Sequence, residues 1–429
     1  MGRLESPVGG RASQVVTSRR ELVAAKILRM RHDGVSVPAQ EPSMPFPFIF
    51  PKERLRLVCL ACALMSSAIA VQADTCPAPG QWLQPEGARL APDALFAELA
   101  ERDVVLLGEQ HDDMDHHRWQ LHTLAGLHGR RPDMVIALEM LPREAQPALD
   151  AWVAGELGEQ AFIDESRWNT AWGFDPALYF PILHFARLHQ VPLKAINVTP
   201  ELRGRLVDEG WEAVPEAERF GITAPVEPPA AYRERLAEVY AQHPSRGGEA
   251  GLERFIEAQL VWDRAMAYGL AQAQEEAHLV VGLIGQGHLQ YEHGVPHQLT
   301  ALSVESYATL LPWAVGGEAC SPPPEGLARA VFTIDESGYE AAPSMLLGVY
   351  TTPHEEGVEI HAILEDSVAE QAGLEVGDII LKAAGQSVAR PAELTGLVRQ
   401  QRPGTLLPLI IRRQGDEREI LARFPPRST

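Results

Sequence analysis

The sequence predicts an α/β fold, a mostly parallel central sheet flanked by helices, followed by a small, mainly β domain. The first observation is that apolar runs of strand length alternate with helical stretches, which is typical of βαβ units. The second is a change of composition near Tyr339, after which short strands and one helix follow. The strands predicted for the first domain lie at 104–107, 134–138, 192–196, 278–284, 301–310 and 327–334.

The helices predicted for the first domain fill the intervals between these strands. The segment 199–275 is expected to be largely helical, with a break at 243–248 where Pro and Gly cluster. An aromatic-rich loop is predicted at 168–174. The main predicted helices are 92–101, 115–128, 144–153, 176–189 and 252–273.

Length and charge limit the classes of protein that fit. With 429 residues the chain is too long for one ordinary domain, so two folded units are expected. Its 45% hydrophobic and 22% charged residues are typical of a globular protein. The net charge of -21 argues against nucleic acid or an anionic membrane as the main partner, because like charges repel.

The segment 44–73 reads as an export signal. Lys52, Arg54 and Arg56 form a basic region, and a continuous apolar run follows at 57–71. Small residues end at Ala73, where a signal peptidase would cut. We therefore predict a periplasmic protein cleaved after Ala73.

The remaining N-terminal features concern the start site and the cysteines. Residues 1–43 are predicted to be an over-extended leader, since a start at Met44 puts the signal first. Cys62 lacks a convincing lipoprotein motif, so a lipid anchor is not expected. In the exported chain Cys76 and Cys320 remain, and an oxidising compartment favours a disulfide between them over two free thiols.

Four predicted parallel strands are followed by polar side chains at the edge where such sheets bind ligands. The run 104–111 ends in Gly-Glu-Gln-His, and the run 280–288 repeats the plan with Gly-Gln-Gly-His. A single such residue is often a helix cap or a turn former. Four strands with two acids and two imidazoles favour a shared functional site, formed by Glu109, His111, Glu139, Asn197 and His288.

Asp263 lies on the apolar stripe of the predicted helix 252–273 and is therefore expected to be buried. A buried carboxylate is costly unless it is paired or binds a ligand. Two alternatives stay open: Asp263 belongs to the site, or it forms a buried salt bridge, for instance with Arg203 or Arg205. An ion pair that borders the site would satisfy both.

Further candidates lie on neighbouring helices. His116 and His117 point about 100° apart on a helix, and His117 has the better phase for facing the site. Tyr179 lies near the aromatic loop at 168–174, and it reads as core packing, as a pocket wall or as a phenolate ligand.

Six separated motifs follow one another in the first domain. They are Gly108-Glu-Gln-His111 with His117, Leu138-Glu-Met140, Trp172-Gly-Phe with Tyr179, Ala195-Ile-Asn197, Asp263-Arg-Ala-Met-Ala267, and Gly285-Gln-Gly-His288 with Gly294-Val-Pro296. Together they resemble the ChaN family of haem-binding uptake proteins, in the Tiki superfamily. The resemblance covers roughly 90–335, and it implies an α/β domain that binds haem, often as a dimer, in bacterial iron uptake.

The C-terminal part resembles a bacterial PDZ domain of the HtrA type, on the motifs at 344–350, 357–360, 367–374 and 377–381. The backbone N–H groups of Leu347, Gly348 and Val349 are expected to bind the carboxylate of a peptide or protein C-terminus. The alternative is a groove that packs on its own chain. The predicted domains are thus 74–338 and 339–429.

Three functions follow from these expectations. Haem binding is favoured, with cofactor contacts from His111, His117, Tyr179, Asn197 and His288. The superfamily also contains metal-dependent peptidases and esterases, so a hydrolase using zinc or manganese is the alternative, with Glu109 or Glu139 as general base. Its metal ligands would be His111, His288, Glu109, Glu139 and Asp263. The third is a scaffold in which the PDZ domain works and the first domain is passive.

Overall fold

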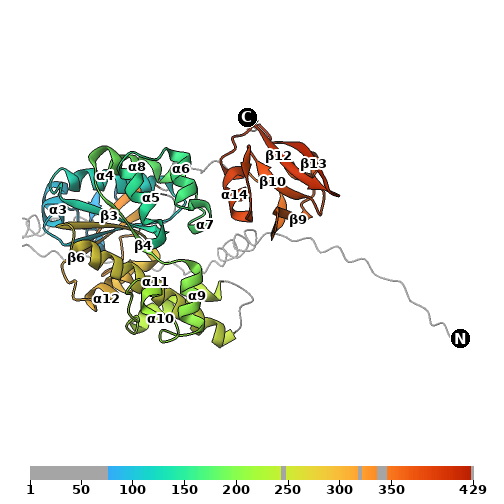
Figure 1. Cartoon of the computed structure of the whole chain (residues 1–429). Coiled ribbons are helices and arrows are strands. Elements are labelled where there is room, and N and C mark those ends of the chain that lie inside the picture. Colours follow the sequence, from blue (N-terminus) through green and yellow to red (C-terminus); the bar gives the residue numbers. More distant parts are fainter. Residues whose placement is uncertain (1–75, 243–247, 317–320, 336–344, 427–429) are drawn as a thin grey trace, which may run out of the picture. The chain divides into compact units, whose positions relative to one another are not determined.

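The computed structural model describes residues 76–242, 248–316, 321–335 and 345–426 (Figure 1). A seven-stranded sheet has the order β1-β7-β6-β2-β5-β3-β4. Its strands are β1 (Trp82–Leu83), β2 (Val104–Glu109), β3 (Met134–Pro142), β4 (Leu193–Asn197), β5 (Leu279–Gly285), β6 (Tyr307–Val315) and β7 (Ala330–Asp335). All neighbours pair in parallel except β1 with β7, so the predicted α/β class is confirmed.

Helices cover both faces of this sheet (Figure 1). One face packs against α3 (Pro92–Leu99), α4 (Met114–His128), α5 (Gln146–Val153), α6 (Glu159–Glu165), α7 (Trp168–Ala171) and α8 (Phe180–His189). The other face packs against α11 (Gly248–Gln274) and α12 (Val295–Thr300). Two further helices, α9 (Pro200–Asp208) and α10 (Ala230–Ala241), pack on α11.

The central strand β2 has apolar side chains on both faces. Val105 and Leu107 belong to the first core, whereas Val104 and Leu106 belong to the second. Side chains of a strand alternate between faces, so a continuous apolar run indicates a strand that is buried on both. β2 pairs in parallel with β5 on one side and β6 on the other.

The structure corrects several predicted elements. The strand expected at 301–310 is displaced to β6, because 301–303 close α12 in a turn and the strand runs on through Pro312. The pairing of β6 with β2 ends at Leu310, before this proline. The strand predicted at 327–334 is β7, and β1 pairs with its outer side, so β1 is at the edge of the sheet. The expected loop at 168–174 contains the short α7.

The C-terminal sheet is antiparallel, with the order β13-β12-β10-β9-β8, and β11 pairs with β10. The elements are β8 (Val349–His354), β9 (Gly357–Ile363), α13 (Val368–Gln371), β10 (Ile379–Ala383), β11 (Gln386–Ser387), α14 (Pro391–Arg399), β12 (Leu406–Arg413) and β13 (Asp416–Arg423). Its core includes Leu347, Leu394 and Leu397. The predicted domain boundary at 338/339 lies outside the described residues and stays a prediction.

Candidate functional site

The polar side chains predicted to share a site come from four strands that are neighbours in the sheet, β2, β5, β3 and β4. Glu109 is the last residue of β2 and Asn197 the last of β4. Glu139 lies inside β3, which continues to Pro142 through a register shift against β4. His288 follows β5 in a single helical turn. Parallel strands deliver these side chains to one edge of the sheet.

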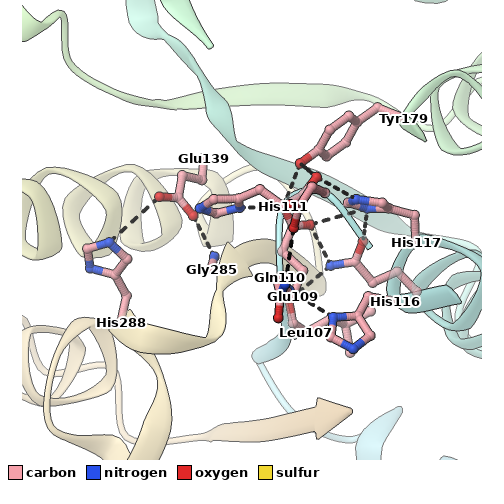
Figure 2. A network of polar contacts seen from close by, with 12 residues as sticks. Leu107, Glu109, Gln110, His111, His116, His117, Glu139, Tyr179, Gly285 and His288 are labelled. Carbon is pink, nitrogen blue, oxygen red and sulfur yellow. Dashed lines mark hydrogen bonds and ion pairs between the residues drawn. The ribbon is translucent and has the colours of Figure 1, made fainter. Parts of the chain in front are cut away.

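The Glu109 carboxylate is the centre of the hydrogen-bond network on β2 (Figure 2). Its Oε1 accepts from the Tyr179 hydroxyl at 2.7 Å and from His111 Nδ1 at 2.9 Å. Its Oε2 accepts from Gln120 Nε2 at 2.9 Å. Burial alone would raise the pKa of Glu109, but the hydrogen bond from His111 and the charges of His117 and His111 outweigh it and lower that pKa. The buried group is therefore a carboxylate with donors on both oxygens.

Gln120 and His117 form the buried floor beneath Glu109. Gln120 Nε2 also faces the Leu107 carbonyl, which only accepts, so the amide oxygen of Gln120 must point to His117 Nδ1 at 3.1 Å. His117 Nε2 faces the His111 carbonyl at 3.1 Å. Both ring nitrogens of His117 thus face oxygen atoms of the chain, which hold the ring in place beneath Glu109.

His111 is the member of this network that reaches open space. Its side chain is 29% exposed, and its ring lies edge-on to Trp172 and beside Phe174, with centroids 4.6 and 5.1 Å away. Nδ1 is held by Glu109, and within the described residues no hydrogen bond reaches Nε2. Burial would lower the pKa of His111, but Glu109 and Glu139 raise it. A Cβ on Gly285 would lie 2.7 Å from His111 Cε1, so only glycine leaves room for this ring.

A second group of charged side chains is formed by His288, Asp263 and Glu139. The Nδ1 atom of His288 is 2.6 Å from Asp263 Oδ1, and its Nε2 atom is 3.7 Å from Glu139 Oε1. Burial would lower the pKa of His288, but Asp263 outweighs this effect and raises it to about 8. Glu139 also accepts the Gly285 N–H at 2.5 Å, so it links the turn after β5 to β3 (Figure 2).

Helix α10 covers this second group. The Tyr232 hydroxyl donates to Asp263 Oδ2 at 2.8 Å, and Arg235 donates to the carbonyls of Gly287 and Gln290 on the turn that carries His288. Tyr232 is 1% exposed. Asp263 is fully buried, as its helical phase predicted, but its partners are His288 and Tyr232. The suggested partners Arg203 and Arg205 are wrong, but Asp263 does form a buried ion pair, with His288.

Asn197 has its amide committed within the chain. Its Nδ2 donates to the Glu139 carbonyl and its Oδ1 accepts the Val198 N–H, each at 2.8 Å. Arg143 donates to the Asn197 carbonyl at 3.0 Å and to the Ala265 carbonyl at 2.7 Å. These bonds hold the ends of β3 and β4 together where their register shifts.

A pocket opens in front of His111. Its walls include the aromatic side chains Trp172, Phe174 and Trp262, and Arg203 is a cation in its lining. Of the predicted site residues, His111 and Asn197 line this pocket. His117 and Tyr179 lie behind His111 with their polar atoms bound to the chain. Burial and the charge of Glu109 raise the pKa of the Tyr179 phenol well above its usual value, so it stays a donor.

Some residues of the site had no prediction from the sequence. Gln120 precedes Leu124 by four residues on one helix face, so the phase argument that placed Asp263 in the core would also have placed Gln120 there. Trp262 and Tyr232 come from helices whose packing on the site has no local signature. Through the described part of the chain, His, Cys, Asp and Glu side chains form no group of three or more that could hold a metal ion.

The loop before β8, which was predicted to bind a peptide carboxylate, is tied to the rest of its domain by backbone hydrogen bonds. The Leu347 carbonyl accepts from Ala369 N–H, and the Gly348 carbonyl accepts from Leu364 N–H. Gly348 has a φ of +82°, and a Cβ there would lie 2.3 Å from Ser367 Cβ. Its left-handed backbone and close packing both require glycine.

The family assignment rests on two matches. The model for haem-binding uptake proteins of the ChaN type, Tiki superfamily, matches residues 95–299. This segment is a ChaN-family domain. A PDZ model matches residues 359–413. Both predicted resemblances are thereby confirmed.

Solved structures and a curated relative are similar to parts of the chain. The structure described as "Cofacial heme binding to ChaN of Campylobacter jejuni" is 17% identical with a TM-score of 0.48, covering 59% of this chain and 96% of that one. A serine endoprotease structure from Yersinia pestis is 28% identical with a TM-score of 0.17, covering 19% of this chain and 29% of that one. The "Probable periplasmic serine endoprotease DegP-like" of Marinomonas sp. (strain MWYL1) is 42% identical over 64 residues, which are 15% of this chain and 14% of the relative.

The cysteine and signal predictions are only partly covered by the described residues. Cys76 is disulfide-bonded. Cys320, its predicted partner, lies outside the described residues, as do the predicted leader and signal segment at 1–73. Among the helices of the described residues, none is long and apolar enough to cross a membrane.

Proposed function

We propose that the ChaN domain binds haem in the pocket in front of His111, and that His111 is the axial ligand. The observation that carries this proposal is the state of the His111 ring. Its Nδ1 is held by the buried Glu109 carboxylate, and its Nε2 has no hydrogen-bond partner among the described residues. A carboxylate on the far nitrogen fixes ring orientation and makes the other nitrogen a better ligand.

The aromatic lining of the pocket suits the flat apolar body of a porphyrin. Haem needs apolar, preferably aromatic walls around one donor atom. Trp172 and Phe174 flank the imidazole at 4.6 and 5.1 Å, and Trp262 forms a further wall. When bound, haem would supply the redox and ligand chemistry of its iron. The chain supplies an imidazole oriented by Glu109 and aromatic walls beside it.

Haem titration of the full chain tests this function. A sharp Soret band that saturates at one haem per His111 site is expected, together with little metal in the protein as purified. A flat titration combined with a stoichiometric transition metal would instead favour the hydrolase. The variant Tyr179→Phe separates the two possible axial ligands: it should keep the Soret band if His111 is the ligand and lose it if the phenol is.

We also propose that the PDZ domain binds a peptide C-terminus at β8. This strand is at the edge of its sheet, and α14 lies beside it with Leu394 and Leu397 turned into the core. An edge strand can pair with an added peptide, and the loop at Leu347–Val349 would receive its carboxylate.

Peptide binding is testable with a glycine pair. A labelled Phe-Gly-Arg-Trp-Val peptide, the ligand named for a solved HtrA3 PDZ domain, is a suitable probe. We expect binding with a free carboxylate and loss of binding when the peptide is amidated. Gly348→Ala should abolish binding. Gly385→Ala is the control, because Gly385 also has a positive φ (+79°) but open space around it. Equal binding by Gly348→Ala and wild type would refute the site.

We further propose that the protein is exported and takes part in iron acquisition. The predicted signal at 44–73 and the bonded state of Cys76 support an oxidising compartment. We expect the mature protein to begin at Asp74 and to be released with the periplasmic fraction. N-terminal sequencing of that fraction checks the cleavage site, and growth with haem as the sole iron source checks the role.

A further inference from the structure

A partly buried arginine lies at the wall of the haem pocket. Arg203 belongs to α9, and its Cζ is 4.2 Å from the ring centroid of Trp262 on α11. Both side chains line the pocket that His111 enters. The stacking fixes the plane of the guanidinium, because cation and aromatic face attract each other.

Arg203 has no carboxylate partner within the described ranges, although acidic side chains are frequent in this chain. Its neighbour on the same helix, Arg205, is paired with both Glu209 and Glu218. Burial lowers the pKa of Arg203, and no acidic group counteracts this effect. A guanidinium nevertheless stays charged in proteins. Its donors are therefore available to an anion that enters the pocket.

The surroundings of Arg203 limit the class of that anion. The pocket carboxylates Glu144, Glu165 and Glu201 are all solvent-exposed, and none forms an ion pair with Arg203. On the inner side the lining is aromatic, with Trp172 and Phe174 around His111. A cation beside such walls suits a ligand with a flat apolar body and a carboxylate on its rim.

We infer that Arg203 is a specificity-determining residue that binds a carboxylate of the pocket ligand, which is a propionate if the proposed haem function holds. The guanidinium presents a planar fork that matches a carboxylate, and Trp262 holds this fork in place before the ligand arrives. Trp262 also packs edge-on against His288 at 5.6 Å, so the turn after β5 supports the same wall. Lysine, a point charge without the fork, would replace Arg203 only partly.

The test compares two ligands that differ only in their carboxylates. The full chain, Arg203→Ala and Arg203→Lys are titrated with haem and with haem dimethyl ester, and Soret changes give each affinity. We expect Arg203→Ala to bind haem about 10–100-fold more weakly, the usual effect of losing a charged hydrogen bond. Its affinity for the ester should equal that of wild type. The haem affinity of Arg203→Lys should lie between those of wild type and Arg203→Ala.

Arg254→Ala is the matched control, because it removes the same charge from an exposed site on α11 that is paired with Asp208. It should leave both affinities unchanged. An equal loss for haem and ester in Arg203→Ala would show a packing role and overturn the inference, as would no loss for either. No Soret change with the wild-type chain is a different result, because it overturns the proposed function itself.

Discussion

His111 and His288 are built on the same local plan and have different surroundings. Each ends a Gly-x-x-His sequence at the end of a buried parallel strand, and each has its Nδ1 on a buried carboxylate, Glu109 or Asp263. The His111 side chain is 29% exposed and faces an aromatic pocket, whereas that of His288 is 12% exposed. The motif therefore sets the orientation of the ring, and the helices around it decide whether a ligand can reach it.

The cover over His288 comes from a segment far from it in sequence. Tyr232 and Arg235 on α10 bind Asp263 and the turn that carries His288. The corresponding side of His111 is formed by the aromatic residues Trp172 and Phe174. Tyr and Arg supply hydrogen bonds that close one site, and the rings leave an apolar wall around the other. Of the two histidines, His111 is the one that lines the pocket.

The largest expected difference between the two histidines is in haem affinity. His111→Ala removes the proposed axial ligand, so its effect should exceed the roughly 10–100-fold loss typical of removing an outer partner of a metal ligand. His288→Ala should change haem affinity less than His111→Ala, because its ring is held by Asp263 on the covered side. Soret titrations measure both. A greater loss of haem affinity in His288→Ala than in His111→Ala would contradict His111 as the axial ligand.

Substitutions of Gly285 and Gly287, at the end of β5 and just after it, test the position of the His111 ring. Gly285→Ala would put a Cβ 2.7 Å from His111 Cε1 and 3.5 Å from Glu139 Oε2, so the His111 ring must move. Haem affinity should fall roughly tenfold or more, as for other displaced metal ligands. Gly287→Ala is the control, because no atom lies within 4 Å of its Cβ. Equal Soret titrations for the two variants would contradict the close approach of His111.

The third prediction concerns stability and pH at His288. Its pKa is raised to about 8 from an ordinary value of 6.5, so the folded state binds the proton more tightly than the unfolded state. The resulting stabilisation, about 2 kcal/mol, is fully present below the unfolded pKa and is lost as the pH rises through the folded pKa. The free energy of unfolding should therefore fall between about pH 6.5 and 8 for this reason.

Urea unfolding at several pH values checks this contribution. His288→Gln should lack that part of the decline, whereas His122→Gln, which changes an exposed histidine on α4, should keep it. Identical pH profiles for wild type and His288→Gln would show that the Asp263–His288 pair does not contribute. Since His111 also has a raised pKa, the difference between the profiles is the quantity to compare.

The sequence predicted the strands that end at the site, because buried parallel strands leave long apolar runs followed by polar residues. It also placed Asp263 in the core, since a helix face has a simple period. It could not assign partners: Tyr179 among aromatic residues reads equally as core, wall or ligand, and its bond to Glu109 depends on how α8 packs. The cover supplied by Tyr232 likewise arises from tertiary packing that no local pattern encodes.

The position of β5 in the sheet has a consequence for how the domain folds. β5 lies between β2 and β3, although it follows both by more than a hundred residues. The bond from Gly285 to Glu139, and the space that Gly285 leaves for His111, exist only after this strand has inserted. Contacts so distant in sequence form slowly, because a long loop must close first. The pocket should accordingly be among the last parts to acquire its native shape, and haem capture can serve as a late reporter of folding.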